Sequence, residues 1–428
     1  MLVTSKCTNS RGDDAHRIGQ IAGYGACLLF TVRGNREEKE VFMAIQVGIP
    51  EEAMISLTDM VDVCAEVRPG MEVVVVAHKD GLYGGDNLVD EEAVAWMASV
   101  VESRGAHCSV LWLDGKQKKD KWYYPAVLHG VVEEADMILC TSFDITTTEL
   151  GNFRRHFEDA KTWMVRIFPV TAPLLMSEWA QTPHELVTAI RHVSSRPFMK
   201  HMAPFVLTDP NGTHLEGFTL DPVQRPGIPG LPYDSYRKQV RHVSFWPEWV
   251  HPPVNCKDVN GVYYFDRMLS WWSRAIGIEP QWQDLIRLDV ENGRIVEISG
   301  GEEARKLKRF LHEMEGKVGD GIWKLDTFHF GVHPNAHVDA DQCPSKLYRR
   351  LVEHAHTCNL HVHIGSAPAN ERYPYYPHIT GDIRRPTLIV GGEQVYDDGY
   401  LCCLDDPEVL AVAARYPDRP TLPGRPEK

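Results

Sequence analysis

Hydrophobic and polar residues alternate along the first half of the chain with two periods, one typical of helices and one of strands. Apolar residues recur at spacings of three and four and predict helices over residues 51–67, 91–103, 125–135 and 183–192. Between them lie short apolar runs, typical of strands covered on both faces, over residues 71–77, 107–113, 137–141 and 163–168. Strands and helices that alternate at this spacing predict a mainly parallel sheet flanked by helices.

The pattern changes near residue 205. Proline, glycine and aromatic residues crowd positions 209–253, and the helical period is absent there. Strands are predicted over residues 213–220, 261–266, 286–290 and 295–298, and a helix over 302–313. Asn292-Gly293 between two of these strands is typical of a hairpin turn. We therefore predict an α/β domain over residues 1–205 and a β-rich α+β domain over 206–428, with a frayed tail from Pro417 onward.

Length and composition narrow the class of protein. A chain of 428 residues is too long for one ordinary core, so two domains are expected. A net charge of −14 argues against a nucleic-acid partner, which needs a basic surface. No apolar run is long enough to span a bilayer, the first 20 residues lack a secretory apolar core, and the 10 cysteines have no Cys-x-x-Cys pair. These features predict a soluble, cytoplasmic protein with reduced thiols.

Histidine is concentrated in one stretch of the C-terminal half. Eight of the chain's 20 histidines lie between residues 329 and 378. Imidazole is neither a strong core former nor a favoured surface group, whereas neutral imidazoles bind divalent metals. The crowding therefore predicts that the β-rich domain carries a metal site, although a lone histidine would more often be a hydrogen-bonded core or surface residue.

An Fe(II) oxygenase site typically combines two histidines and one carboxylate, which leaves positions for substrate and O2. We select His329 and His378 as the imidazole ligands, because each lies in a short strand-like segment close to a glycine. The third ligand is less defined by the sequence. Asp382 is our choice, while Thr380 occupies the His-x-Asp position, so Thr380 and Glu248 stay open as alternatives.

His361 and His363 alternate along a predicted strand, so both imidazoles lie on one face. Either can be a ligand, orient substrate or relay a proton, and the alternative is one buried and one half-exposed histidine with no such role. We predict His363 as the acid/base group and keep His361 as the other candidate. His354 and His356 fall on a predicted helix and would point apart, so we interpret both as surface residues.

Other candidates line a possible substrate pocket. Glu248 is surrounded by apolar residues and needs a partner, which can be a metal, a substrate hydroxyl or an arginine. Tyr376 follows two other tyrosines and can line a flat pocket for an aromatic ring, or simply pack in a proline-rich loop. We include His333, Thr380 and Tyr376 as candidate substrate-binding residues.

The order of several motifs carries a family resemblance. They are Asp209-Pro210-Asn211-Gly212-Thr213, Pro247-Glu248, Asn260-Gly261, residues 293–301, Phe330-Gly331, His363-Ile364-Gly365, and His378 ahead of Pro386-Thr387. In this order the chain resembles the superfamily that joins aminopeptidase T type metallopeptidases with 2,5-dihydroxypyridine 5,6-dioxygenase. The peptidases have a glutamate where this chain has His329, so the resemblance is closer to the dioxygenase branch. It implies that His329 and His378 are iron ligands, and it places Thr380 at the aspartate position unless the segment is realigned to Asp382.

The resemblance implies a homo-oligomeric enzyme of aromatic ring cleavage, as in pyridine catabolism, and the composition predicts that it is cytoplasmic. We expect a non-haem Fe(II) extradiol-type dioxygenase that takes a hydroxylated aromatic or N-heterocyclic small molecule and O2, with His363 as acid/base and Glu248 orienting substrate. The alternative is a metal-dependent amidohydrolase or aminopeptidase that uses Zn, Co or Mn to activate water. A metal-free binding protein is the third hypothesis.

Overall fold

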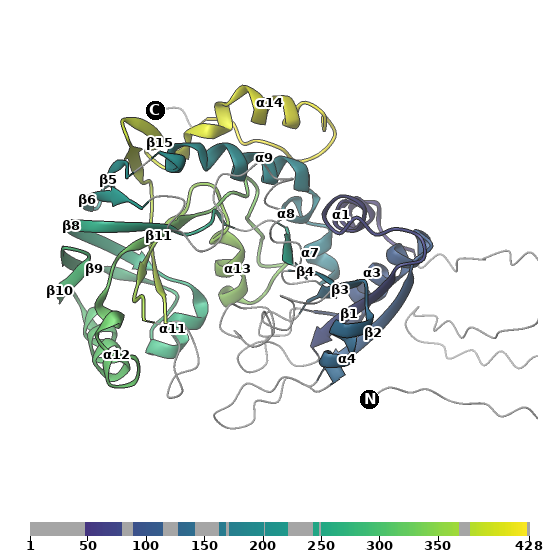
Figure 1. The fold of residues 1–428 in the computed structure, drawn as a ribbon, viewed down its shortest axis with the longest axis horizontal. Helices are drawn as coiled ribbons and strands as arrows, with labels where there is room; N and C mark the ends of the chain where they lie inside the picture. The colour runs from purple at the N-terminus through teal and green to yellow at the C-terminus, as the bar shows by residue number, and fades with distance from the viewer. Residues whose placement is uncertain are drawn as a thin grey trace, which may run out of the picture.

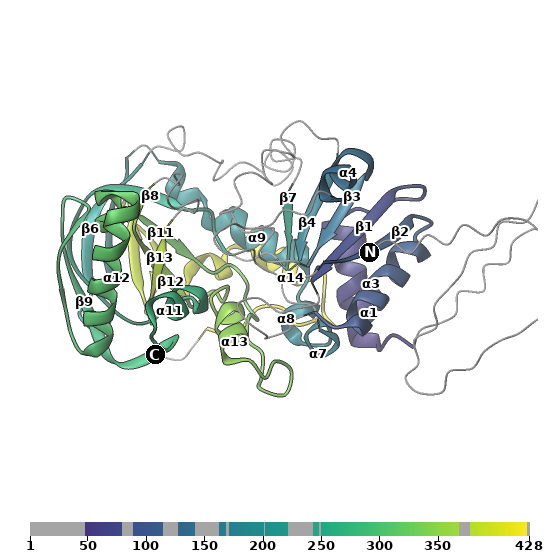
Figure 2. The ribbon, with the colours of Figure 1, turned by 90° about the horizontal axis from the view of Figure 1, so that it is seen from below.

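The computed structural model describes residues 48–78, 89–113, 127–141, 162–167, 171–200, 202–220, 243–247, 250–367 and 377–425. Two bodies of sheet lie side by side, the helix-flanked one formed mainly by the first part of the chain and the larger one by the second (Figure 1). Helices α9 (His184–Ser194) and α13 (Lys346–Glu353) lie between the two sheets in both views (Figure 2). The predicted succession of an α/β part and a β-rich part is confirmed at this level.

The first sheet has five strands in the order β2-β1-β3-β4-β7, and every pairing is parallel. Its strands are β1 (Glu72–His78), β2 (His107–Leu113), β3 (Met137–Cys140), β4 (Trp163–Ile167) and β7 (Val243–Trp246). The strands and the helices α1 (Glu51–Thr58), α3 (Glu91–Ser103) and α4 (Val127–Glu134) confirm the predicted alternation. A domain boundary at residue 205 stays a prediction, since β7 belongs to this first sheet although it follows that residue.

The predicted helix over 51–67 is present in a modified form. Its first part is α1, and it continues as a π-helix, η1 (Asp59–Cys64). Short helices α7 (Ala172–Leu175), α8 (Glu178–Gln181) and η2 (Arg196–Met199) precede and follow α9. After η1, the Arg68-Pro69-Gly70 turn leads into β1. Gly70 has a φ of 83°, which glycine adopts without a steric penalty.

The second sheet has 11 strands and is antiparallel. Its main path is β13-β12-β11-β8-β6-β5-β14-β15-β16, and β9 and β10 extend from β8. The strands are β5 (Pro204–Thr208), β6 (His214–Thr219), β8 (Val254–Arg267), β9 (Gln281–Glu291), β10 (Arg294–Ser299), β11 (Thr327–Phe330), β12 (Leu360–Ile364), β13 (Ile379–Ile383), β14 (Thr387–Val390), β15 (Glu393–Asp397) and β16 (Tyr400–Leu401).

The hairpin and helix predicted for this half are confirmed. Asn292 and Gly293 both have positive φ, 50° and 72°, as a type I′ turn between β9 and β10 requires. Helix α12 (Glu302–Val318) runs further than predicted and buries Leu307 and Leu311. The remaining helices are α11 (Ser270–Ile276), η4 (Asp320–Trp323), η5 (Cys402–Asp405) and α14 (Pro407–Ala413).

The prediction of a frayed tail from Pro417 is wrong for the described part of that segment. Arg419 forms an ion pair with the buried Asp59 at 3.1 Å and donates to the Gln181 carbonyl oxygen at 2.8 Å. The Thr421 carbonyl oxygen accepts from Asn335 Nδ2 at 2.7 Å. Polar groups of the tail find partners on η1, α8 and the loop after β11, and these long-range contacts are not visible in the composition.

None of the described helices combines the length and the apolar character needed to cross a bilayer. Among the described residues no cysteine forms a disulfide, and several cysteines are buried: Cys64, Cys140, Cys256 and Cys343.

Candidate metal centre

Three neighbouring strands of the antiparallel sheet bring most of the predicted site residues to one face. His329 on β11 is paired with His361 on β12, and His361 is paired in turn with Asp382 on β13. His363 stands two residues along β12 and is paired with Thr380. Because side chains on a strand alternate between faces, these five side chains lie on the same face. The opposite face is apolar and belongs to the core, with Phe328, Phe330, Leu360, Val362 and Ile364 buried.

His329 is oriented by a backbone contact. Its Nδ1 donates a hydrogen bond to the His251 carbonyl oxygen at 3.0 Å. A carbonyl oxygen only accepts, so the proton is on Nδ1 and the lone pair is on Nε2. That Nε2 is buried and has no hydrogen-bond partner. Burial, together with the neighbouring His378, lowers the pKa of His329 to about 3, so the ring is neutral at physiological pH.

His361 and His363 complete a group of imidazoles. The His329 ring stacks on His361 at 5.1 Å and on His363 at 4.4 Å between ring centroids. Nδ1 of His361 and Nδ1 of His363 are buried without a hydrogen-bond partner. Burial lowers the pKa of both residues well below the ordinary value, and the adjacent imidazoles act in the same direction. Three neutral rings with unused nitrogens therefore face one another.

These three residues have the arrangement of a metal ligand set. One ring nitrogen of each lies within 4.8 Å of one ring nitrogen of each of the other two. A buried nitrogen without a partner is costly, and coordination to a divalent cation would offset that cost. Imidazole suits iron, zinc and copper, so the donor set fits a transition metal better than Ca²⁺ or Mg²⁺.

The predicted ligands His378 and Asp382 lie beside this group, in different surroundings. The ring of His378 is 5.0 Å from that of His363 and packs edge-on against Trp272 at 5.9 Å. The Asp382 carboxylate contacts the guanidinium of Arg350 on α13. The prediction that His329, His378 and Asp382 hold one metal ion stays a prediction, while the compact set here is His329, His361 and His363.

The interpretation of His354 as a surface residue is wrong. His354 is the C-cap of α13, has helical backbone angles and donates its N–H to the Arg350 carbonyl oxygen at 3.1 Å. It therefore lies one helical turn after the buried Arg350, on the same face, and is 1% exposed. Its ring lies 3.9 Å from that of His361, and its Nδ1 is 3.4 Å from the Asp382 carboxylate. His354, His361 and Asp382 form a second compact group of potential ligands. His356 is partly exposed, and its Nδ1 accepts from the backbone of Cys358.

The absence of a side chain at Gly331 lets the segment of Ala355 and His356 approach the end of β11. A Cβ at this position would lie 2.1 Å from the carbonyl oxygen of His356 and 2.3 Å from that of Ala355. Gly331, two positions after His329, therefore leaves room for the backbone of Ala355 and His356, which directly follow His354. The space that Gly331 leaves open is thus occupied by another segment of the chain.

The remaining candidates are placed as follows. His333 is fully buried, accepts from the Asn335 backbone at 3.3 Å, and packs 6.4 Å from the ring of Trp179 on α8. The Thr380 hydroxyl accepts from the Leu269 backbone at 3.1 Å, so its oxygen is already engaged. Glu248 and Tyr376 lie outside the described residues.

Comparisons with known proteins add a shared fold. No family model matches the sequence, and no curated protein matches it. The 2,5-dihydroxypyridine dioxygenase of Pseudomonas putida KT2440 aligns over 84% of this chain and 99% of its own, with a TM-score of 0.54 and 13% identity. The chain has the fold of that dioxygenase. AmpT of Thermus thermophilus aligns over 82% of this chain and 98% of its own, with a TM-score of 0.45 and 14% identity.

Proposed function

We propose that the chain is a non-haem Fe(II) dioxygenase that opens the ring of a hydroxylated aromatic or N-heterocyclic small molecule, such as a hydroxypyridine. The observation that carries this proposal is the compact group of three neutral imidazoles, each of which has a buried ring nitrogen without a hydrogen-bond partner. The shared fold with a 2,5-dihydroxypyridine dioxygenase supports this substrate class.

His329, His361 and His363 would hold the iron. Their lowered pKa values keep each ring neutral, so one nitrogen of each ring is unprotonated. No proton therefore competes with the metal for that nitrogen near neutral pH. The hydrogen bond from His329 Nδ1 to the His251 carbonyl oxygen fixes the tautomer that presents Nε2 to the metal. Bound Fe(II) would supply the redox chemistry that O2 requires and open positions for ligands.

The chain itself would bind and orient the substrate. Among the described residues at the cluster, the carboxylate is Asp382, and it is in contact with Arg350. Neutral imidazoles do not balance the charge of a divalent ion, so an anionic ligand would bind to it favourably. An acidic hydroxyl on an aromatic ring would supply such an anion. His378, which lies beside His363 and against Trp272, would hold the proton or oxygen of such a hydroxyl.

The test is O2 uptake after anaerobic loading with Fe(II), over a panel of dihydroxypyridines and catechols. We expect uptake for at least one compound, loss of it in His329→Ala, and retention in His337→Ala. His337 is a suitable control because its side chain is 66% exposed and contacts Asp339. No uptake across the panel with stoichiometric iron bound would contradict the proposal.

A second candidate function is a metal-dependent amidohydrolase or aminopeptidase that uses Zn, Co or Mn. It is supported by the donor set, since three histidines also form a catalytic zinc site in which bound water becomes acidic. Elemental analysis separates the two: one iron per chain supports the dioxygenase, whereas zinc or cobalt with amide hydrolysis supports the hydrolase.

A further inference from the structure

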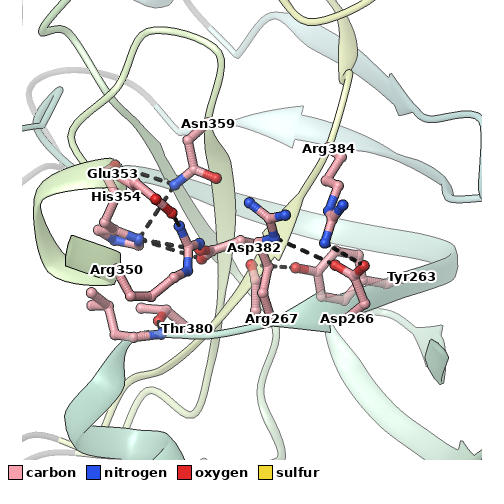
Figure 3. A network of polar contacts seen from close by, with 12 residues as sticks. Tyr263, Asp266, Arg267, Arg350, Glu353, His354, Asn359, Thr380, Asp382 and Arg384 are labelled. Carbon is pink, nitrogen blue, oxygen red and sulfur yellow. Dashed lines mark hydrogen bonds and ion pairs between the residues drawn. The ribbon is translucent and has the colours of Figure 1, made fainter. Parts of the chain in front are cut away.

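A buried network of polar side chains joins Arg350, His354 and Asp382 (Figure 3), and it reaches the imidazole cluster where His354 lies beside His361. Arg350 comes from α13, His354 from the C-cap of that helix, and Asp382 from β13. Arg350 is 4% exposed, and His354 and Asp382 are each 1% exposed. A charged pair at this depth is kept only where its geometry and its additional hydrogen bonds compensate for lost hydration.

The Asp382 carboxylate already has a cationic partner. The guanidinium of Arg350 contacts it, and the same guanidinium is held in place by Glu353 at 3.3 Å. Burial lowers the pKa of Arg350 to about 10, which still leaves it charged at neutral pH. A metal ion at Asp382 would have to displace this guanidinium or lie next to it, and two cations at that distance repel each other.

The network contacts one imidazole of the cluster, that of His361, through the ring of His354. His354 Nδ1 is 3.4 Å from the Asp382 carboxylate, and the His354 carbonyl oxygen accepts from Asn359 Nδ2 at 3.2 Å. The ring of His354 in turn lies 3.9 Å from that of His361. On its other side, His361 stacks on His329 with 16° between the ring planes. His361 is therefore confined between two rings, and the ion pair is connected to it through His354.

We propose that Arg350, Asp382 and His354 form a positioning unit that fixes the ring of His361, and that Asp382 acts through Arg350 and His354 rather than as a metal ligand. The inference rests on the proposed metal site at His329, His361 and His363. The neighbouring group of His354, His361 and Asp382 is then an orienting contact and not a second metal site. Outer partners of this kind tune metal affinity without touching the metal.

Co(II) titration of the full chain tests the unit, because the absorption spectrum reports coordination independently of activity. We expect Asp382→Asn and His354→Gln each to weaken Co(II) binding by about ten- to a hundredfold while keeping one ion per chain and the wild-type band pattern. Since both substitutions break one unit, the double variant should bind about as tightly as the weaker single variant. His354→Gln keeps the Arg350–Asp382 pair and therefore reports even if Asp382→Asn fails to fold.

Asp266→Asn is the matched control. Asp266 pairs with Arg384 at 2.9 Å in the same region of the sheet but contacts none of the clustered histidines in the described structure. This variant should bind Co(II) like the wild type. Abolished Co(II) binding or a changed band pattern in Asp382→Asn, with no effect of His354→Gln, would show that Asp382 is a ligand and would overturn the inference. Wild-type affinity in both variants would overturn it as well.

A crystal structure of metal-free His354→Gln separates this inference from the proposed function. We expect the His361 ring to leave its stacked orientation against His329, and an unchanged ring would contradict the positioning unit whatever the metal. Failure of the wild type to bind Co(II) or Fe(II) would instead remove the proposed function, together with the metal-dependent part of this inference.

Discussion

His329 and His361 lie directly opposite each other on β11 and β12, and their rings stack at 5.1 Å with 16° between the planes. Two neutral imidazoles that share a face of an antiparallel pair would ordinarily be satisfied by water or by polar neighbours. Here Nε2 of His329 and Nδ1 of His361 are buried without hydrogen-bond partners. This relationship is the basis of the proposed metal site.

Replacement of Gly331 should destabilise the fold next to the cluster. In Gly331→Ala, the added Cβ would meet two carbonyl oxygens at 2.1 and 2.3 Å, and backbone atoms cannot move aside as a flexible side chain can. We expect the free energy of unfolding to fall by roughly 1–3 kcal/mol. Gly316→Ala is the control, because Gly316 lies exposed in α12 with nothing within 4 Å and should gain about 0.5–1 kcal/mol. Urea denaturation measures both, and equal effects would contradict the packing argument.

Loss of Arg419 should destabilise the chain strongly, although this residue lies only nine positions before Lys428. Asp59 is 2% exposed, and Arg419→Ala would leave its carboxylate without the cation that it faces at 3.1 Å. Breaking a buried pair costs about 3–5 kcal/mol. Arg415→Ala breaks an exposed pair with Glu185 and should cost about 0–1 kcal/mol. Thermal or chemical denaturation of the two variants provides the comparison, and a small effect of Arg419→Ala would mean that the tail is not anchored there.

The β-strand and helix periods of the first half predicted its elements well, because residues such as Val73, Val75 and Met97 are buried by simple amphipathic packing. The hairpin at Asn292-Gly293 was likewise predictable, since positive φ at two successive positions restricts the residue types. Strand β7 was not predicted. It has four residues, and its place beside β4 depends on a long-range crossover rather than on a local pattern.

The candidate site was predicted in outline but not in its contacts. The crowded histidines include residues of two neighbouring strands, β11 and β12, and the alternation of His361 and His363 along β12 puts both rings on one face. Nothing local distinguishes Asp382 as an ion-pair partner from Asp382 as a ligand, because Arg350 is 32 positions away and reaches it only through the packing of α13. His354 was misread because the sequence does not show which face of α13 packs against the sheet: His354 follows Arg350 by one helical turn, and both contact Asp382.

Acid should destabilise the protein through His333. Burial, with the neighbouring His356, lowers the pKa of His333 to about 3, whereas an unfolded histidine titrates near 6.5. Above about pH 6.5 the ring is neutral in both states, so there is no cost. Between about pH 6.5 and 3 only the unfolded state takes up the proton, and stability falls by up to about 1.4 kcal/mol per pH unit.

The measurement is urea denaturation of wild type and His333→Gln at pH values from 7 to 4. The other buried histidines contribute to both proteins, so the difference between the two slopes isolates His333. We expect the variant to lose less stability on acidification. Parallel pH profiles would show that His333 is not buried in its neutral form.

Metal should stabilise the folded chain through the cluster. Because the ligand set is assembled only by the pairing of β11 with β12, Fe(II) should bind the native state and not the unfolded one. At about 100 times the Kd, anaerobic Fe(II) should raise the free energy of unfolding by about 2.7 kcal/mol. His361→Ala should abolish this gain and His337→Ala should keep it, whereas equal gains in both would point to binding elsewhere.

The proposal that three imidazoles hold one iron is tested most directly by elemental analysis of the chain after anaerobic Fe(II) loading and removal of excess metal. We predict one iron per chain in the wild type and in His337→Ala, and none in His329→Ala, His361→Ala or His363→Ala. Two metal ions per chain, or one that persists in all three of these variants, would contradict the account.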